Sequence, residues 1–387
     1  MSPNLQNLRS SIPLLKKTNL VYLDSACSSL KPAPVIEAIV DYYQNFPACA
    51  NRSIHSLGLK VTKEVEIARK NIANFIGAKQ NEIIFTKNTT DSINLVAHSL
   101  DFKPNDIILT NDKEHNSNFL PWQNHKIAQH KIISTKNGHI NIPELEQILK
   151  THKIKLLSIS LTSHLDGITI EASKIIKLAH KYNTLVLLDS AQTLLHKKIN
   201  VKSLGADFLA FSSQKIMGPT GLGVLFVKDI KTLTPTNFGG GVVNDDQTII
   251  NGPSAFEAGT QNYASLIGFS RAIDAINKIP KEEIETNLKE LSVYLLQNLK
   301  TIKDLIIINE SPKPTSIISF YIKNKNSESI AIKLDIKYNI AVRSGHFCTH
   351  YYFKQNKINS ALRITLAPYN NKKDIEKLIK ALTKICL

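Results

Sequence analysis

The sequence predicts an α/β protein in which a large domain, built on a mostly parallel seven-stranded sheet, carries a smaller α+β domain. Three observations lead to this prediction. The 387 residues are enough for two domains of ordinary size. Between about residues 20 and 230, seven short apolar runs alternate with stretches of helical length, which is typical of βαβ units. After Gly259 two long helical stretches lead into a region of mixed strands and helices.

The strands of the larger sheet are expected where apolar and β-branched residues follow one another. Such runs suit a sheet that helices cover on both faces. The seven segments are Glu82–Phe85, Ile107–Thr110, Lys131–Ser134, Leu156–Leu161, Thr184–Leu188, Phe208–Phe211 and Leu222–Val227. Helices are expected between them at Val35–Asn45, Lys60–Ile76, Asp91–Ser99, Pro143–Lys150 and Ala172–Lys181.

The C-terminal part of the chain has the pattern of a separate α+β unit. Its expected elements are helices Tyr263–Ile279 and Lys281–Lys300, strands Leu305–Asn309 and Ser316–Ile322, helix Ser327–Lys337, strand Ile340–Arg343 and helix Lys372–Ile385. We therefore expect a large domain over residues 20–275 and a small domain formed by residues 1–19 and 276–387. No repeat or low-complexity linker separates them, so the two domains should pack together.

Composition narrows the class of protein. Hydrophobic residues make up 42% and charged residues 21%, which excludes extensive disorder. The formal charge is +16, but only six of the 48 basic residues are arginine. Because the lysines are scattered and arginine is the residue that reads bases and phosphates, we expect a basic surface and no nucleic-acid partner.

Cysteine usage and hydropathy indicate a reduced, cytoplasmic protein. The four cysteines are spread over the chain without a CxxC pair. The N-terminus has no basic-then-apolar signal, and no run approaches the roughly 18–20 apolar residues that cross a bilayer. We expect no membrane partner and no metal.

The first chemically informative segment is Phe85–Asp91, where a predicted strand ends and a predicted helix begins. Its residues Thr89, Thr90 and Asp91 can cap the helix, and a helix N-terminus also attracts phosphate. Taken alone, this segment is more often an ordinary helix cap, so it does not by itself indicate a phosphate site.

The second segment is Leu185–Gln192, in which four apolar residues precede Asp189. This places a carboxylate at the carboxyl end of a strand, where ligands bind in open α/β sheets. A buried carboxylate needs a cationic or hydrogen-bonding partner, and a protonated pyridine nitrogen would be one. A helix cap or a metal ligand is the alternative role.

The third segment is Ala210–Gly223, where Lys215 lies between an apolar strand and a turn rich in glycine and proline. In a dry site such a lysine can lose its proton and form a Schiff base. A lone loop lysine usually faces solvent. The order of paired threonines, a strand-end Asp189 and Lys215 26 residues later favours a cofactor site.

That order resembles the fold-type I pyridoxal-phosphate enzymes, and in detail the SufS-type cysteine desulfurase and selenocysteine lyase group of the class V aminotransferases. Further segments match this family in order and approximate spacing over residues 20–370. They are Tyr22–Ala26, Arg52–Ser56, Glu114–His115, Pro121–Gln123, Phe256–Thr260 and Arg343–Cys348.

The resemblance implies a role for each matched residue. Lys215 would bind pyridoxal 5'-phosphate covalently and move protons, Asp189 would pair with the ring nitrogen, and His115 would stack on the ring as a further acid or base. The remaining cofactor contacts would come from Thr89, Thr90, Gln192, Ser212 and Gln214, with Thr260 reaching in from the second subunit of a homodimer. Substrate contacts would come from Arg363, Arg343, His164, Ser25 and Ala26.

The resemblance also implies sulfur chemistry at Cys348. Arg343, His346 and Arg363 would favour its thiolate, which would take sulfur from L-cysteine as a persulfide and leave L-alanine. The sulfur would pass to an acceptor protein of the SufE, SufU or scaffold type for iron–sulfur cluster assembly. Selenocysteine lyase, an epimerase or an aminotransferase are alternative activities within the family, and a sulfur-transfer scaffold without enzymatic activity is a third possibility.

Two positions depart from the family pattern. His164 stands where the family usually has asparagine near the substrate carboxylate, and Gln214 stands where histidine commonly precedes the Schiff-base lysine. Glutamine can still donate to a phosphate, so we expect the cofactor to bind. We expect His164 to alter substrate preference or pH response.

Overall fold

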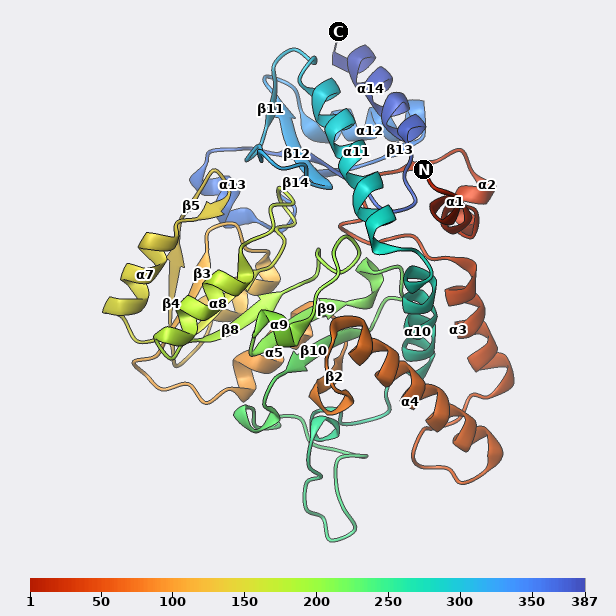
Figure 1. Cartoon of the computed structure of the whole chain (residues 1–387), viewed down its shortest axis with the longest axis vertical. Helices are drawn as coiled ribbons and strands as arrows, with labels where there is room; N and C mark the ends of the chain where they lie inside the picture. The colour runs from red at the N-terminus through yellow and green to blue at the C-terminus, as the bar shows by residue number, and fades with distance from the viewer. Residues whose placement is uncertain (387) are drawn as a thin grey trace.

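The computed structural model describes residues 1–386, and within them the larger sheet has seven strands, as predicted (Figure 1). Their order across the sheet is β2 (Ile83–Thr86), β10 (Gly223–Val227), β9 (Phe208–Ser212), β8 (Leu185–Asp189), β7 (Ile154–Ser160), β3 (Ile107–Asn111) and β4 (Gln129–Ile133). β10 runs antiparallel to both of its neighbours, and the other adjacent pairs are parallel. The prediction of a mostly parallel sheet is confirmed.

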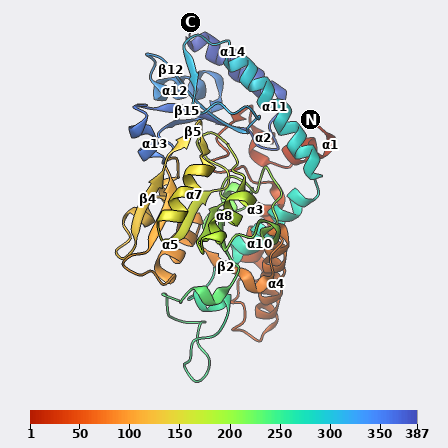
Figure 2. The same cartoon turned by 60° about the vertical axis from the view of Figure 1, so that its left-hand side comes forward.

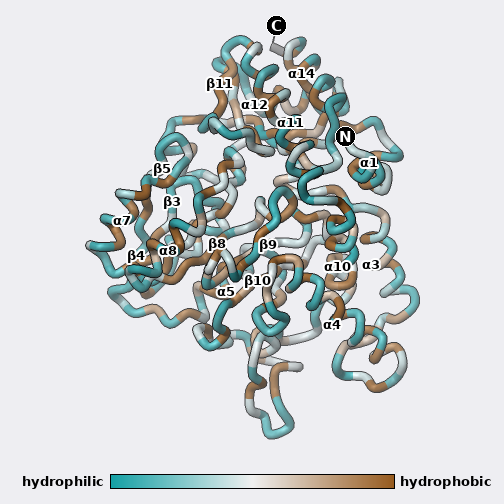
Figure 3. Tube along the Cα trace, viewed as in Figure 1, coloured by the Kyte–Doolittle hydropathy of each residue, from teal (hydrophilic) through white to brown (hydrophobic). Residues whose placement is uncertain are grey.

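Helices cover both faces of this sheet, and the strand sequences explain why. Leu156 and Leu157 are neighbours in β7, yet they belong to two different hydrophobic clusters, because successive side chains of a strand point to opposite faces. Figure 3 shows these central strands largely in white and brown, surrounded by hydrophilic loops. The covering helices are α4 (Ser56–Ile76), α5 (Thr89–Ser99), α7 (Ile142–Thr151), α8 (Ala172–Lys181) and α10 (Tyr263–Asn277), and α3 (Ala33–Asn45) packs against α10.

A second, antiparallel sheet lies above the first in both Figure 1 and Figure 2. Its strand order is β11 (Leu305–Ile307), β12 (Ile317–Ile322), β15 (Ala361–Thr365) and β14 (Arg343–Gly345). The helices of this part are α11 (Lys281–Leu299), α12 (Ser327–Tyr338), α13 (His350–Gln355) and α14 (Lys372–Cys386).

The predicted strand Ile340–Arg343 is wrong as a single element. Its first half is β13 (Ile340–Ala341), which pairs with β1 (Val21–Tyr22), whereas Arg343 begins β14 and pairs with β15. β15 was not predicted, because its short apolar run is interrupted by Arg363. The remaining short elements are α1 (Pro3–Ser10), α2 (Pro13–Lys17), α6 (Leu120–Gln123), β5 (Thr135–Lys136), β6 (His139–Ile140) and α9 (Val201–Leu204).

The N-terminal helix α1 is joined to the C-terminal part of the chain by polar contacts. The Arg9 guanidinium forms an ion pair with Asp374 at 2.9 Å, and Asn4 donates a hydrogen bond to Glu283 at 3.0 Å. These contacts agree with assigning residues 1–19 to the small domain. The domain boundaries themselves stay a prediction.

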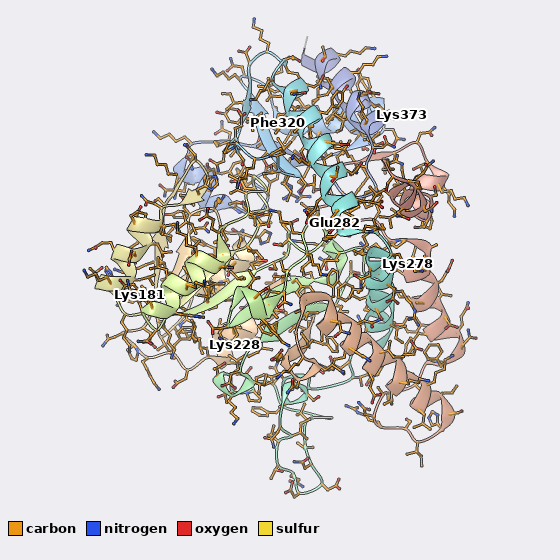
Figure 4. All side chains as sticks on the ribbon, in the orientation of Figure 1. Lys181, Lys228, Lys278, Glu282, Phe320 and Lys373 are labelled. Atoms are coloured by element: carbon orange, nitrogen blue, oxygen red, sulfur yellow. The ribbon has the colours of Figure 1, made fainter. Side chains whose placement is uncertain are left out.

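The lysine excess is spread over the outside of the molecule. Figure 4 labels Lys181, Lys228, Lys278 and Lys373, which come from different parts of the chain and reach the outside of the molecule at several places. This arrangement is that of a generally basic surface. No helix within residues 1–386 combines the length and the apolar character needed to cross a bilayer.

His196 lies at the contact between the two parts of the chain, and it makes stability depend on pH. Its side chain is 8% exposed, and its Nδ1 shares a hydrogen bond with Ser316 Oγ at 3.1 Å. Burial, aided by the charge of Lys281, lowers the pKa of His196 to about 4. Below a pH of about 6.5 the unfolded chain therefore binds a proton that the folded chain excludes.

We expect the free energy of unfolding to decrease as the pH is lowered from about 6.5 to about 4. His196 should contribute about 1.4 kcal/mol per pH unit to that slope. His196→Gln should show a shallower slope by this amount in urea unfolding of the cofactor-loaded protein. His98→Gln, at an exposed position of α5, is the matched control and should keep the natural slope. Equal slopes for the natural chain and His196→Gln would contradict the assignment.

Candidate active site

A cavity of about 270 Å³ lies at the carboxyl ends of the central strands. It collects residues from distant parts of the sequence, as the predicted motifs require. The predicted site residues that line it are Ala26, Thr89, Thr90, His115, His164, Asp189, Gln192, Ser212, Gln214, Lys215, Arg343, Cys348 and Arg363.

The buried Asp189 and the half-buried Lys215 are an acid and a base that line this cavity together. Asp189 ends β8, and Lys215 follows the end of the neighbouring strand β9. Burial raises the pKa of Asp189, while the Lys215 charge and the Ala191 N–H, which donates to Asp189 Oδ1 at 2.9 Å, oppose the increase. Burial also lowers the pKa of Lys215. A carboxylate and a readily deprotonated amine thus face one enclosed space.

The start of α5 supplies hydrogen-bond donors suited to an anion. Asn88 caps this 11-residue helix by accepting from the Asp91 N–H at 2.9 Å. Hydroxyl groups gather beside it: Thr89 Oγ1 lies 2.6 Å from Ser212 Oγ, and Thr90 Oγ1 lies 2.7 Å from the Oγ of Ser117. Hydroxyls next to a helix N-terminus form a favourable site for a phosphate.

Gly223 allows α5 to begin so close to the sheet. A Cβ atom built on this residue would lie 2.5 Å from the Cα of Asn88, so any side chain would push the helix start away from β10. In the same sheet Gly223 is paired with Ser212 of β9. The two strands therefore hold the Ser212 hydroxyl against the first turn of the helix.

Two histidine rings meet on another wall of the cavity. The rings of His115 and His164 lie edge to face with their centres 4.8 Å apart. Burial, together with the charges of Lys215 and Arg363, lowers the pKa of His115 to about 3. The Ser117 N–H donates to His115 Nδ1 at 3.0 Å, so the neutral ring carries its proton on Nε2. A neutral, flat ring suits stacking on an aromatic cofactor.

Arg363 presents a guanidinium to the cavity although its side chain is only 5% exposed. Its Nη2 donates to Asp24 Oδ1 and its Nη1 to the carbonyl of His164, both at 3.2 Å. Among the described residues, its Nε has no hydrogen-bond partner. Burial lowers the pKa of Arg363, but Asp24 stabilises the charge. A buried guanidinium of this kind can bind a substrate carboxylate.

Cys348 lies on a tightly constrained turn at the cavity wall. Phe347 and Cys348 have φ values of 53° and 60°, a left-handed conformation that non-glycine residues adopt rarely. The Cys348 carbonyl accepts from the Asn116 N–H at 2.7 Å, and His164 Nε2 lies 2.5 Å from the Thr349 hydroxyl. These contacts hold the turn whose half-buried thiol lines the same cavity as Lys215 and Arg363.

Two predicted residues lie outside this cavity. Ser25 is 3% exposed, and its hydroxyl is hydrogen-bonded at 2.6 Å to the Tyr369 hydroxyl, so in the structure it anchors the loop that carries Ala26. Thr260 is exposed and does not line the cavity of its own chain. Its predicted contact from a second subunit stays a prediction.

Sequence reasoning also missed several lining residues. Cys27, Asn88, Ser117, Ser160, Thr162, Ala191 and Phe347 line the cavity, and Asp24 holds Arg363. Asp24 and Cys27 lie in or next to the matched segment Tyr22–Ala26, which was the available signal.

The donor set fits pyridoxal phosphate. An amine for covalent attachment, a carboxylate for the ring nitrogen and hydroxyls at a helix start for the phosphate all line one cavity. Gln192 is an exception, because its Nε2 donates to the Ala26 carbonyl at 2.8 Å. Its contact with the ring hydroxyl stays a prediction.

Comparison with known proteins agrees with this donor set. The model of the family described as aminotransferase class-V matches residues 21–378, so the chain belongs to that family of pyridoxal-phosphate enzymes. A cysteine desulfurase from Wigglesworthia glossinidia brevipalpis is 35% identical over 100% of this chain and 98% of its own length.

Two solved structures agree with this relative. The apo cysteine desulfurase of Thermococcus onnurineus has a TM-score of 0.93 at 33% identity, with 98% of this chain and 97% of that chain covered. The cysteine desulfurase CsdA of Escherichia coli, in its S-sulfonic acid form, has a TM-score of 0.91 at 28% identity, with both chains covered completely. Within the class V family, the chain is a cysteine desulfurase.

Proposed function

We propose that this chain moves the sulfur of L-cysteine onto Cys348 as a persulfide and releases L-alanine. The observation that carries the proposal is a half-buried thiol on the same small cavity as Lys215, Asp189 and Arg363. When bound, pyridoxal phosphate supplies an electron sink that stabilises negative charge at the substrate Cα. The other steps fall to residues of the chain.

Arg363 binds the substrate carboxylate, which fixes the Cα–H bond beside the Lys215 amine. Lys215, with its pKa lowered by burial, takes the Cα proton. The Cys348 thiolate then attacks the substrate sulfur, so that a sulfur–sulfur bond forms and the bond between sulfur and Cβ breaks. The electron pair of that bond remains on carbon and is protonated there, which gives L-alanine and a persulfide on Cys348.

The product assay separates this reaction from the other activities of the class. The cofactor-loaded protein, given L-cysteine and a thiol reductant, should release alanine and sulfide in equal amounts. An aminotransferase would give a keto acid, and an epimerase would give D-cysteine. Either product in place of alanine would contradict the proposal, and so would a protein that cannot be loaded with pyridoxal phosphate.

His164 should position the turn that carries Cys348. Its ring is hydrogen-bonded to Thr349, and its carbonyl accepts from Arg363. Loss of one such hydrogen bond costs about 1 kcal/mol, so His164→Asn should lower kcat with L-cysteine roughly fivefold.

Thr349→Val removes the same bond from the other partner and is the matched test. Because both changes delete one interaction, the double variant should lose little more than the more affected single variant. Fully additive losses would show that His164 and Thr349 act independently and would contradict the positioning role.

The sulfur acceptor is proposed to be a protein of the SufE, SufU or scaffold type that serves iron–sulfur cluster assembly. Exposed side chains of Arg343, His346 and His350 surround the Cys348 turn. Arg343, which also lines the cavity, gives its mouth a positive charge, which suits an acidic partner surface.

A homodimer is also proposed. Helix α3 exposes Ile36, Val40 and Tyr43 at helical spacing, with Tyr43 62% exposed, and Ile54 nearby in the chain is 94% exposed. Apolar groups concentrated on one helix face indicate an interface. Sedimentation of the natural protein should give twice the mass of one chain.

A further inference from the structure

A second cysteine, Cys27, lines the same cavity as Cys348. Neither thiol forms a disulfide within the described chain. Cys27 is exposed to solvent. Cys348 is less exposed, because it is half-buried on its constrained turn. The cavity therefore contains two thiols, one at the proposed reacting centre and one that solvent reaches more freely.

The loop that carries Cys27 is fixed to the cavity at several points. The Cys27 N–H donates to the Asp24 carbonyl at 3.0 Å, and Asp24 in turn holds Arg363. The carbonyl of the preceding Ala26 accepts from Gln192 Nε2 at 2.8 Å. Cys27 thus belongs to a loop that the active site itself holds in place.

Cationic groups lie around both thiols. Burial lowers the pKa of Lys215, and the negative charges of Asp189, Cys27 and Cys348 oppose this, so both sulfurs lie within electrostatic range of one amine. Burial lowers the pKa of Lys31 to about 8, and Cys27 opposes this as well. Lys31, Lys215 and Arg363 are thus three cationic groups that lie close enough to interact with Cys27.

We propose that Cys27 is a second sulfur carrier, which takes over the sulfur first bound by Cys348. The Cys27 thiolate attacks the terminal sulfur of the Cys348 persulfide. A bond forms between the sulfur of Cys27 and that terminal sulfur, the bond to the sulfur of Cys348 breaks, and Cys348 leaves as a thiolate. The proton stays on the transferred sulfur, and no oxidant or reductant is consumed.

This inference rests on the proposed function, because it needs a persulfide on Cys348. Its consequence is that Cys348 becomes free for a second turnover before any acceptor arrives. The more exposed Cys27 then presents the sulfur at the cavity mouth. Cys49, half-buried and not part of the cavity lining, has no such access.

The test uses the cofactor-loaded full chain with excess L-cysteine, without reductant or acceptor. The initial burst of alanine per chain is measured, and bound sulfur is located by alkylation and peptide mass spectrometry. We expect sulfur on both Cys27 and Cys348 in the natural protein. Cys27→Ser should show half the natural burst with sulfur on Cys348 alone, and Cys27→Ala should behave in the same way. Cys49→Ser is the matched control and should keep the full burst.

Three outcomes would overturn the carrier role. The first is a full burst from Cys27→Ser. The second is a disulfide between Cys27 and Cys348 with release of sulfide, which would mean attack on the inner sulfur. The third is equal labelling of Cys49, which would mean transfer of sulfane sulfur through a small persulfide in solution, such as cysteine persulfide. Absence of sulfur from Cys348 in the Cys27→Ser protein would instead contradict the proposed function, so the two failures can be told apart.

Discussion

Lys215→Ala is expected to abolish alanine formation from L-cysteine and to remove the visible absorption of covalently bound pyridoxal phosphate. The amine is the group that attaches the cofactor; its pKa is lowered by burial, and it lines the same cavity as Asp189. Loss of the proton transfer alone lowers the rate by about 10³-fold. Loss of covalent attachment adds to this effect, so activity should fall to background.

Lys228→Ala is the matched control, because Lys228 is an exposed lysine whose ammonium lies 4.0 Å from Asp207. It should retain natural absorption and activity. Added pyridoxal phosphate should still bind Lys215→Ala without the covalent absorption band, since Asp189 and the hydroxyls around α5 remain. A Lys215→Ala protein with the natural spectrum would contradict the assignment.

Cys348→Ala is expected to abolish alanine release from L-cysteine while sparing much of the release from L-selenocysteine. A thiolate nucleophile is needed to take sulfur from the substrate, whereas selenium leaves carbon more readily and depends less on it. Cofactor absorption should be unchanged, because Lys215 and Asp189 are untouched. The measurement is alanine formed per minute from each substrate, with Cys49→Ala as the control cysteine.

The comparison of the two substrates distinguishes the chemical alternatives. Equal retention of both activities in Cys348→Ala would remove this cysteine from the mechanism. Equal loss of both activities, together with altered cofactor absorption, would indicate that Cys348 supports the structure of the site and would contradict its role as the nucleophile.

Most of the fold could be predicted because the strands of a covered sheet are apolar on both faces. Each of the seven predicted segments overlaps its strand, with ends shifted by at most two residues, as for Lys131–Ser134 against β4 (Gln129–Ile133). β15 was missed because Arg363 breaks its apolar run. That arginine is stabilised by Asp24, a partner 339 positions away in the sequence. No local pattern could have predicted such a pair.

In the candidate site, too, features set by the local sequence could be predicted, whereas contacts between distant segments could not. Asp189 and Lys215 could be placed because strand ends in an α/β sheet meet at one edge. Ser25 was expected near substrate, but its hydroxyl is hydrogen-bonded to Tyr369, which comes from the far end of the chain. The contact of His164 with Thr349 and the shared cavity of Cys27 and Cys348 likewise depend on how distant loops pack.

The most direct measurement is peptide mass spectrometry of Cys348 after one turnover with L-cysteine in the Cys27→Ser background, without reductant. This background prevents transfer to the second thiol. We predict one added sulfur on the peptide that contains Cys348, formed together with one alanine, and no added sulfur when Lys215 is also replaced by alanine. Alanine formed without sulfur on Cys348 would contradict the proposal that this thiol accepts the sulfur of the substrate.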